Sequence, residues 1–145
     1  METIIKDLKN ELSYKTRLEA LDKIKDYDLN DEEYFFIKIL VIKLALTDRV
    51  FAVKHAAFLL CQKNKLKKNN EPINLGKKNT GYSPNDVRKM FLKIKRQTGM
   101  EALDLDLFKE YFQTIAPQMY DVMSSEHMYF DNWIRGIYKY LSKLL

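Results

Sequence analysis

Few residues in the chain have the types and spacing that catalysis or metal binding requires. Cys61 is the only cysteine, and it stands among apolar residues of an expected helix, where a thiol acts as a small hydrophobic side chain. His55 lies six residues earlier, near the opposite face of that helix, so the two do not form a dyad. His127 and Asp131 have a spacing that can bind metal, but with Glu126 they are too few for a metal site. We therefore expect no catalytic residue, no metal ligand and no cofactor.

Two further groups of residues could act in acid–base catalysis or in base stacking, but a role in the fold explains each of them. Asp104, Asp106 and Glu110 bring three carboxylates close together, but acidic residues at the start of a helix also suit its dipole. Aromatic residues near the C-terminal end could stack on nucleic-acid bases, but their helical spacing predicts that most of them form core. They are Tyr129, Phe130, Trp133, Tyr138 and Tyr140.

The distribution of charge is the strongest functional signal in the sequence. Between Arg49 and Gly99 there are 13 Lys and Arg residues and two acidic residues, whereas the rest of the chain has 12 basic and 18 acidic residues. Such asymmetry indicates an acidic partner, although a lysine-rich surface that only aids solubility would give the same count. The candidate partner-binding residues are Lys63, Lys65, Lys67, Lys68, Lys77, Lys78, Lys89, Lys93 and Arg96.

Length and composition limit the elements that could carry these residues. A chain of 145 residues is long enough for one domain with its own core, and four Gly and three Pro are too few for a turn-rich β protein. One cysteine excludes an internal disulfide framework and fits a reducing cytoplasm. The N-terminal residues lack the apolar stretch of a signal peptide, and the longest apolar run, 34–46, is too short to span a membrane. We expect a cytoplasmic protein with no membrane association.

Helical periodicity dominates the chain. Ser13 and Thr47-Asp48 are expected helix N-caps, and the helix over 30–46 is apolar on nearly every face, so it should be covered on several sides. Leu107 and Tyr111 are expected to face inward with Phe108 and Phe112. The expected helices cover 13–27, 30–46, 49–63, 83–98, 101–115 and 127–144, with short helical segments near 4–12 and 119–123.

The segment at about 64–83 interrupts this pattern. It is polar and basic and contains Pro72, Gly76 and Gly81, so we expect it to be a mobile loop in a single domain of residues 1–145. The next helix should begin with Ser83 as cap and Pro84 in its first turn, and end at Gly99. Its apolar residues Val87, Met90, Phe91 and Ile94 would be buried opposite Lys89, Lys93 and Arg96.

Three short segments share a pattern of a basic residue, two variable residues and two small or apolar residues. They begin at Arg17, Lys54 and Arg88, which are 37 and 34 residues apart, a spacing that fits helix-pair repeats. Residues 48–60 resemble the second helix of a HEAT repeat, with Asp48, Val53-Lys54, Ala57 and Leu60 at the matching positions. This resemblance mainly covers residues 13–62, and it implies stacked helix pairs that offer a surface to a protein partner.

A second resemblance concerns residues 82–100. They resemble the recognition-helix region of AraC-type regulators, with Phe91 followed by basic residues and then Thr98-Gly99-Met100. The distance from Phe91 to Thr98 is two residues longer than usual, and a Pro/Gly/Asn loop stands where the partner helix of a helix-turn-helix should be.

We therefore predict a compact all-α protein of about six or seven helices, either a helical bundle or a short HEAT-like α-solenoid. The predicted function is a non-enzymatic interaction module that presents a basic helical surface to a protein or other acidic partner. The alternative is a nucleic-acid-binding protein that uses the same basic face, either without sequence specificity or as a helix-turn-helix-like regulator.

Overall fold

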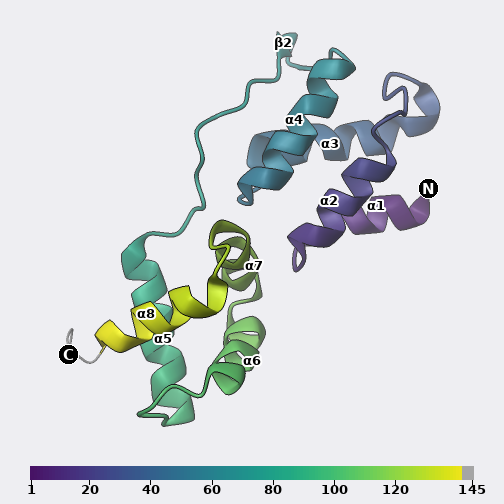
Figure 1. The fold of residues 1–145 in the computed structure, drawn as a ribbon. Coiled ribbons are helices and arrows are strands. Elements are labelled where there is room, and N and C mark those ends of the chain that lie inside the picture. Colours follow the sequence, from purple (N-terminus) through teal and green to yellow (C-terminus); the bar gives the residue numbers. More distant parts are fainter. Residues whose placement is uncertain (142–145) are drawn as a thin grey trace. The chain divides into compact units, whose positions relative to one another are not determined.

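The chain is built from helices, with one small two-stranded hairpin (Figure 1). The computed structural model describes residues 1–141, and these contain eight α-helices and one 3-10 turn. The all-α fold class is thus confirmed. The chain divides into two compact units, Met1–Thr80 and Gly81–Leu145, and each is described by itself. Our expectation of a single domain over residues 1–145 stays a prediction.

The unit Met1–Thr80 contains two helix pairs. Helix α1 packs on α2 and α3 on α4, and the pairs meet through α1 with α3 and α2 with α4. The elements are α1 (Glu2–Leu8), α2 (Tyr14–Lys23), the 3-10 turn η1 (Glu32–Tyr34), α3 (Phe35–Thr47), α4 (Phe51–Lys63), β1 (Lys67–Lys68) and β2 (Glu71–Pro72). Their core is aliphatic, and the residues with no exposed surface include Ile24, Leu29, Ile37, Val41 and Val53.

Local signals fix one helix start in this unit but not another. The Ser13 hydroxyl accepts a hydrogen bond from the Thr16 amide at 3.2 Å, so the predicted cap of α2 is confirmed. The predicted cap of α4 is wrong, because that helix begins after Val50. The Asp48 carboxylate instead accepts from the Val50 amide at 2.8 Å and pairs with Arg17, so it organises the connection between α3 and α4.

Helix α3 is covered on fewer sides than its apolar sequence predicts. Ile37, Val41 and Ala45 are fully buried, but Phe36 is 69% exposed and Ile39 is 46% exposed. The expectation of cover on several sides is therefore wrong for one face. The helices that pack on α3 are α1 and α4, and they leave Phe36 and Ile39 in contact with water.

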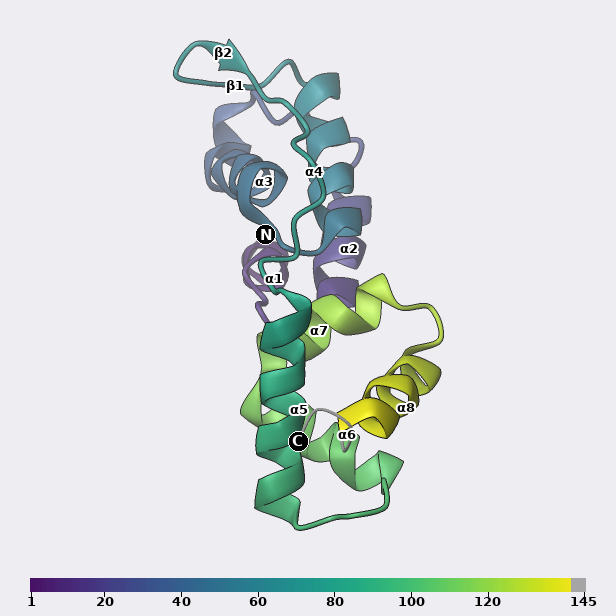
Figure 2. The same ribbon diagram turned by 90° about the vertical axis from the view of Figure 1, so that its left-hand side faces the viewer.

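The segment after α4 has more structure than a loop. Strands β1 and β2 pair with antiparallel register, and the turn residues Asn69 and Asn70 both have positive φ, as a type I′ turn requires. Leu66 before the hairpin and Ile73 after it are buried. In Figure 2 the chain then runs back along α4 as an extended strand-like segment. The mobility expected for residues 64–83 stays a prediction, but two apolar side chains anchor the segment to the core.

The unit from Gly81 onward contains four helices around an aromatic core. Helix α5 packs on α6 and α8, and α6 also contacts α7 and α8. The helices are α5 (Pro84–Thr98), α6 (Leu105–Ile115), α7 (Pro117–Glu126) and α8 (Phe130–Leu141). The expected end of the last helix at Leu144 lies outside the described residues.

Phe91 on α5 is the centre of this aromatic core. Its ring makes edge contacts with Phe108 and Phe112 on α6 and with Trp133 on α8, at centroid distances of 4.7, 5.5 and 5.6 Å. Tyr138 lies against Phe108 at 5.8 Å. Tyr120 on α7 meets Phe112 edge-on at 5.3 Å, so all four helices contribute rings to one cluster.

Two residues predicted to face inward on α6 are exposed. Phe108 and Phe112 are buried as expected, but Leu107 is 36% exposed and Tyr111 is 37% exposed. The buried residues of α6 are Phe108 and Phe112, whose rings pack on Phe91. No helix in residues 1–141 is long and apolar enough to span a bilayer.

Candidate interaction surface

Helix α5 is held in place by signals within its own sequence. The Ser83 hydroxyl accepts from the Asp86 amide at 3.1 Å, and the Asp86 carboxylate accepts from the Ser83 amide at 2.8 Å. The two hydrogen bonds of this capping box favour the ionised carboxylate, so they hold the pKa of Asp86 below its usual value. Pro84 occupies the first turn, and Gly99 ends the helix with φ +67°. The predicted start and end of α5 are both confirmed.

The two faces of α5 have different roles. Val87, Phe91 and Ile94 are buried, whereas Lys89, Lys93 and Arg96 are exposed. We call these three cations the α5 basic face. The only acidic residue in the helix is Asp86, which is engaged at the cap. Within residues 1–141 none of the three cations forms a salt bridge, although the charge of Lys89 helps to lower the pKa of Asp86.

Lys95, by contrast, belongs to the packing of this unit. Its ammonium lies 5.6 Å from the ring centroid of Tyr138, within the range of a cation–π contact. The Tyr138 hydroxyl in turn donates to the Met100 carbonyl at 2.7 Å. These contacts attach the C-terminal end of α5 to α8.

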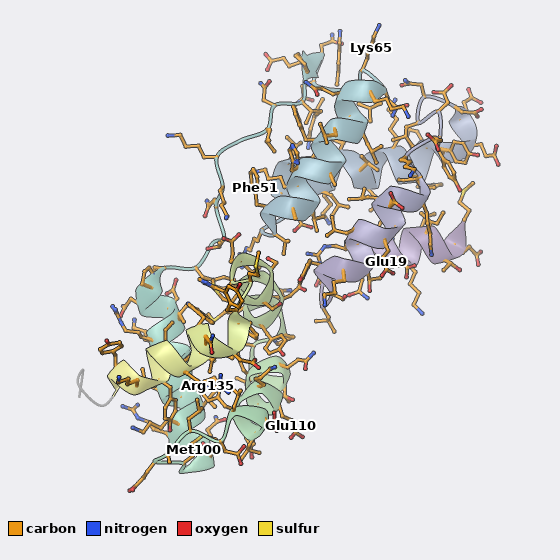
Figure 3. All side chains as sticks on the ribbon, in the orientation of Figure 1. Glu19, Phe51, Lys65, Met100, Glu110 and Arg135 are labelled. Atoms are coloured by element: carbon orange, nitrogen blue, oxygen red, sulfur yellow. The ribbon has the colours of Figure 1, made fainter. Side chains whose placement is uncertain are left out.

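The end of α4 carries a second group of lysines, Lys63, Lys65, Lys67 and Lys68, all of which are exposed. Lys65 has φ +52°, and the amides of Lys65 and Leu66 donate to the carbonyls of Gln62 and Cys61. These bonds form a Schellman motif with lysine at the position that usually holds glycine. Figure 3 shows Lys65 where the chain leaves α4.

The positive charge of the lysines at the end of α4 is partly offset by an acidic residue beside Lys63. Its ammonium donates to the Lys25 carbonyl at 2.7 Å and lies 3.6 Å from the Asp26 carboxylate. Asn64 ties the same connection down, because its side chain accepts from the Leu29 amide at 3.1 Å. The fold therefore brings the acidic segment between α2 and α3 against the basic end of α4.

Lys77 and Lys78 lie on the extended segment that follows the hairpin, and both are exposed. The Lys78 ammonium is 6.0 Å from the ring centroid of Phe51 on α4. Figure 3 shows Phe51 on the side of α4 that the extended segment follows. Six of the nine predicted residues belong to the unit Met1–Thr80 and three to the unit from Gly81 onward.

The candidate catalytic and metal-binding residues are buried or make contacts that stabilise the fold. Cys61 is 1% exposed, and burial raises the pKa of its thiol to about 11. The His127 ring stacks on Trp133 at 4.3 Å, while Asp131 forms an ion pair with Lys109 at 2.9 Å. The hydrogen bond with Asp131 raises the pKa of Lys109.

One of the clustered carboxylates caps a helix, and the C-terminal aromatic residues differ in their exposure. Asp104 caps α6 by accepting from the Leu107 amide at 3.2 Å. Of the five aromatic residues of which most were expected to form core, Tyr138 is buried and Phe130 and Trp133 are half-buried. The other two, Tyr129 and Tyr140, are 72% and 55% exposed. Within residues 1–141 no group of three or more His, Cys, Asp or Glu residues is arranged to hold a metal ion.

Sequence reasoning missed the ion pair between Arg17 and Asp48. Both side chains are almost completely buried, at 7% and 5% exposed, and their nearest atoms are 2.9 Å apart. The two residues are 31 positions apart, so local patterns could not predict the pair.

The comparisons with known proteins found no matching family model, curated protein or solved structure.

Proposed function

We propose that this protein is a non-enzymatic interaction module that presents a basic helical surface to an acidic protein segment or another acidic partner. The α5 basic face carries this proposal. Lys89, Lys93 and Arg96 are exposed on a helix that is fixed by a capping box at one end and a glycine at the other. None of the three forms a salt bridge within the described part of the chain, and Lys89 only adds a through-space attraction to Asp86.

The geometry of the α5 basic face suits an extended or helical acidic segment. Residues at i, i+4 and i+7 span about 10 Å along a helix. Exposed ion pairs contribute about 0.2–1 kcal/mol each, so three of them give a weak, salt-sensitive contact. Because the helix is already ordered, binding costs little backbone entropy.

The burial of the cysteine and the contacts of the carboxylates support an interaction role over catalysis. The Cys61 thiol is buried, with a pKa raised to about 11, so little thiolate forms near neutral pH. The carboxylates of Asp86 and Asp104 cap helices, and that of Asp131 pairs with Lys109. The buried thiol also agrees with a reducing compartment, and we keep a cytoplasmic location as part of the proposal.

Nucleic-acid binding is the alternative, because the same cations would neutralise phosphates. The helix-turn-helix version has less support, since residues 74–83 before α5 are not helical. A sequence-nonspecific contact needs no such helix. The experiment below separates these outcomes by its probes.

We also propose that α1 to α4 form a short HEAT-like stack. The contacts of α1 with α3 and of α2 with α4 support this, because stacked helix pairs meet through equivalent helices. The Arg17–Asp48 pair joins α2 to the start of the connection before α4, and Asp48 is one of the residues of the resemblance. Such a stack would serve as a scaffold for protein contacts.

The test uses the full chain and three labelled probes: a glutamate-rich peptide, random-sequence duplex DNA and single-stranded RNA. Fluorescence anisotropy at low and moderate salt would measure binding of the wild type and of the triple variant Lys89→Glu/Lys93→Glu/Arg96→Glu. The matched control is Lys6→Glu/Lys15→Glu/Lys23→Glu, which changes the net charge equally at exposed sites on α1 and α2.

We expect the peptide to bind the wild type at low salt, and the α5 variant to bind it at least about tenfold more weakly than the control does. Stronger binding to DNA or RNA than to the peptide, lost in the same variant, would replace the proposal with the nucleic-acid alternative. Equal binding by the two triple variants, or no binding of any probe at low salt, would refute a role for the α5 basic face.

A further inference from the structure

Helix α3 carries an exposed stripe that nothing in the proposed function uses. Three of its residues are spaced three and four apart on one side of α3, and the fourth comes four residues before them, in the 3-10 turn η1 that leads into the helix. This side is opposite the buried residues Ile37, Val41 and Ala45. We call it the α3 stripe, and it consists of Glu32, Phe36, Ile39 and Lys43.

The centre of the α3 stripe is apolar. Phe36 is 69% exposed and Ile39 is 46% exposed, which leaves two large apolar side chains one helical turn apart in contact with water. The Phe35 ring meets Phe36 edge-on at 5.7 Å and extends the apolar area. Burying this surface against a partner would be favourable by the hydrophobic effect.

The ends of the α3 stripe carry opposite charges. Glu32 stands at the N-terminal end and Lys43 at the C-terminal end, and both are exposed. In residues 1–141 neither side chain forms an ion pair. The order acid, apolar, apolar, base is therefore its own complement when read in the reverse direction.

From this self-complementarity we propose that the α3 stripe binds the α3 stripe of a second copy of this chain, with the two helices antiparallel. A two-fold axis between Phe36 and Ile39 places each Ile39 against Phe36 of the second copy. The same register places each Lys43 against Glu32 of the second copy. A two-fold contact of this kind uses the same surface on both copies, so it produces a dimer and does not extend into a filament.

The dimer is weak, because one helix face per copy buries less area than a stable interface of about 1,200 Å² or more. We expect a dissociation constant on the order of 0.1 mM. The stripe lies on α3 and is separate in sequence from the α5 basic face, so this inference stands whether or not the proposed function holds.

Sedimentation equilibrium of the full chain over a wide concentration range tests the contact. Lys43→Glu alone would face each new carboxylate with Glu32 of the second copy, and Glu32→Lys alone would pair like charges in the same way. We expect each single change to weaken the dimer about tenfold, because symmetry makes it act twice. The double change Glu32→Lys/Lys43→Glu restores complementary charges and should return the dissociation constant to within about threefold of the wild type.

The matched control is the exchange Lys15→Glu/Glu19→Lys on α2, at exposed residues outside the stripe, which should leave dimerisation unchanged. Phe36→Ser/Ile39→Ser should abolish the dimer without loss of helical signal, because both residues are exposed. A wild type that stays monomeric up to about 1 mM would overturn the proposal. So would charge variants that behave like the control.

Disulfide trapping tests the antiparallel register. Under mild oxidation, a mixture of Phe36→Cys and Ile39→Cys chains should form mixed dimers in preference to dimers of either variant alone. The native thiol does not interfere, since Cys61 is buried. Preferential self-linking of the Phe36→Cys chain would indicate a parallel arrangement and overturn the proposed geometry.

Discussion

Arg17 on α2 and Asp48 at the end of α3 form a buried bidentate ion pair. The Arg17 Nε and Nη2 atoms donate to the two carboxylate oxygens at 2.9 and 3.2 Å, and Nη1 donates to the Asn10 carbonyl at 2.7 Å. Asp48 also accepts from the Val50 amide. One pair of side chains thereby connects the two helix pairs and both of the short connections within them.

Removing one member of this pair should destabilise the unit α1–α4 strongly. We expect Asp48→Ala to lower the free energy of unfolding by about 3 kcal/mol, because the Arg17 charge would stay buried without its partner. Urea denaturation followed by helical circular dichroism measures the change. The control is Asp22→Ala, whose carboxylate lies 3.5 Å from Lys25 in an exposed pair, and it should cost less than about 1 kcal/mol. Equal costs for the two variants would show that the buried pair has no special role.

Lys65 offers a route to greater stability. Its φ of +52° lies in the left-handed region, where a side chain costs energy and glycine does not. Lys65→Gly should therefore raise the free energy of unfolding by about 0.5–1 kcal/mol. Lys67→Gly, in the neighbouring strand, is the control and should give no gain, since glycine weakens a strand. A decrease with Lys65→Gly would mean that the long side chain makes a stabilising contact there.

The capping box of α5 predicts a pH dependence at acid pH. The pKa of Asp86 is lowered in the folded chain, so its contribution to stability is complete above the unfolded value and is lost as the pH falls through the folded value. NMR titration of the side-chain carboxyl carbon should give a midpoint below 3.8, the ordinary value. The Asp86→Asn variant should lose this part of the pH dependence. A midpoint at or above the ordinary value would contradict the capping geometry.

Tyr138 should contribute through its hydroxyl as well as its ring. The hydroxyl donates to the Met100 carbonyl at 2.7 Å, and Tyr138→Phe would leave that carbonyl without this donor, at a cost of about 1 kcal/mol. Burial also raises the pKa of Tyr138. Its contribution should therefore be complete below pH 10.0, the unfolded value, and be lost as the pH rises through the folded value. The exposed Tyr129→Phe change is the control and should be neutral.

How well the sequence predicted each element depended on the distance over which its determinants act. Ser83, Pro84 and Gly99 all lie within or beside α5, and its start and end were predicted correctly. The start of α4 was predicted wrongly, because Asp48 has a partner 31 residues away. Periodicity identified Phe108 and Phe112 as core, but it could not show that Leu107 beside them is exposed.

The same limit applies to the candidate surface. Counting charges along the chain identified nine basic residues, and all nine are exposed. The count could not show that Lys63 lies beside Asp26, because the acidic segment is brought to it by the packing of α2 on α4. It also gave no sign of the α3 stripe, since an apolar helix gives the same pattern whether a face is covered or not.

The position of Trp133 gives the two halves of the chain different optical signals. It is the only tryptophan in the sequence, and its indole stacks on His127 at 4.3 Å and meets Phe91 edge-on at 5.6 Å. Intrinsic emission excited at the red edge of protein absorption therefore reports melting of the segment from Gly81 onward, whereas far-ultraviolet ellipticity reports both halves. Coincident midpoints would mean that the halves melt together, and separate midpoints would assign a melting temperature to each half without cutting the chain.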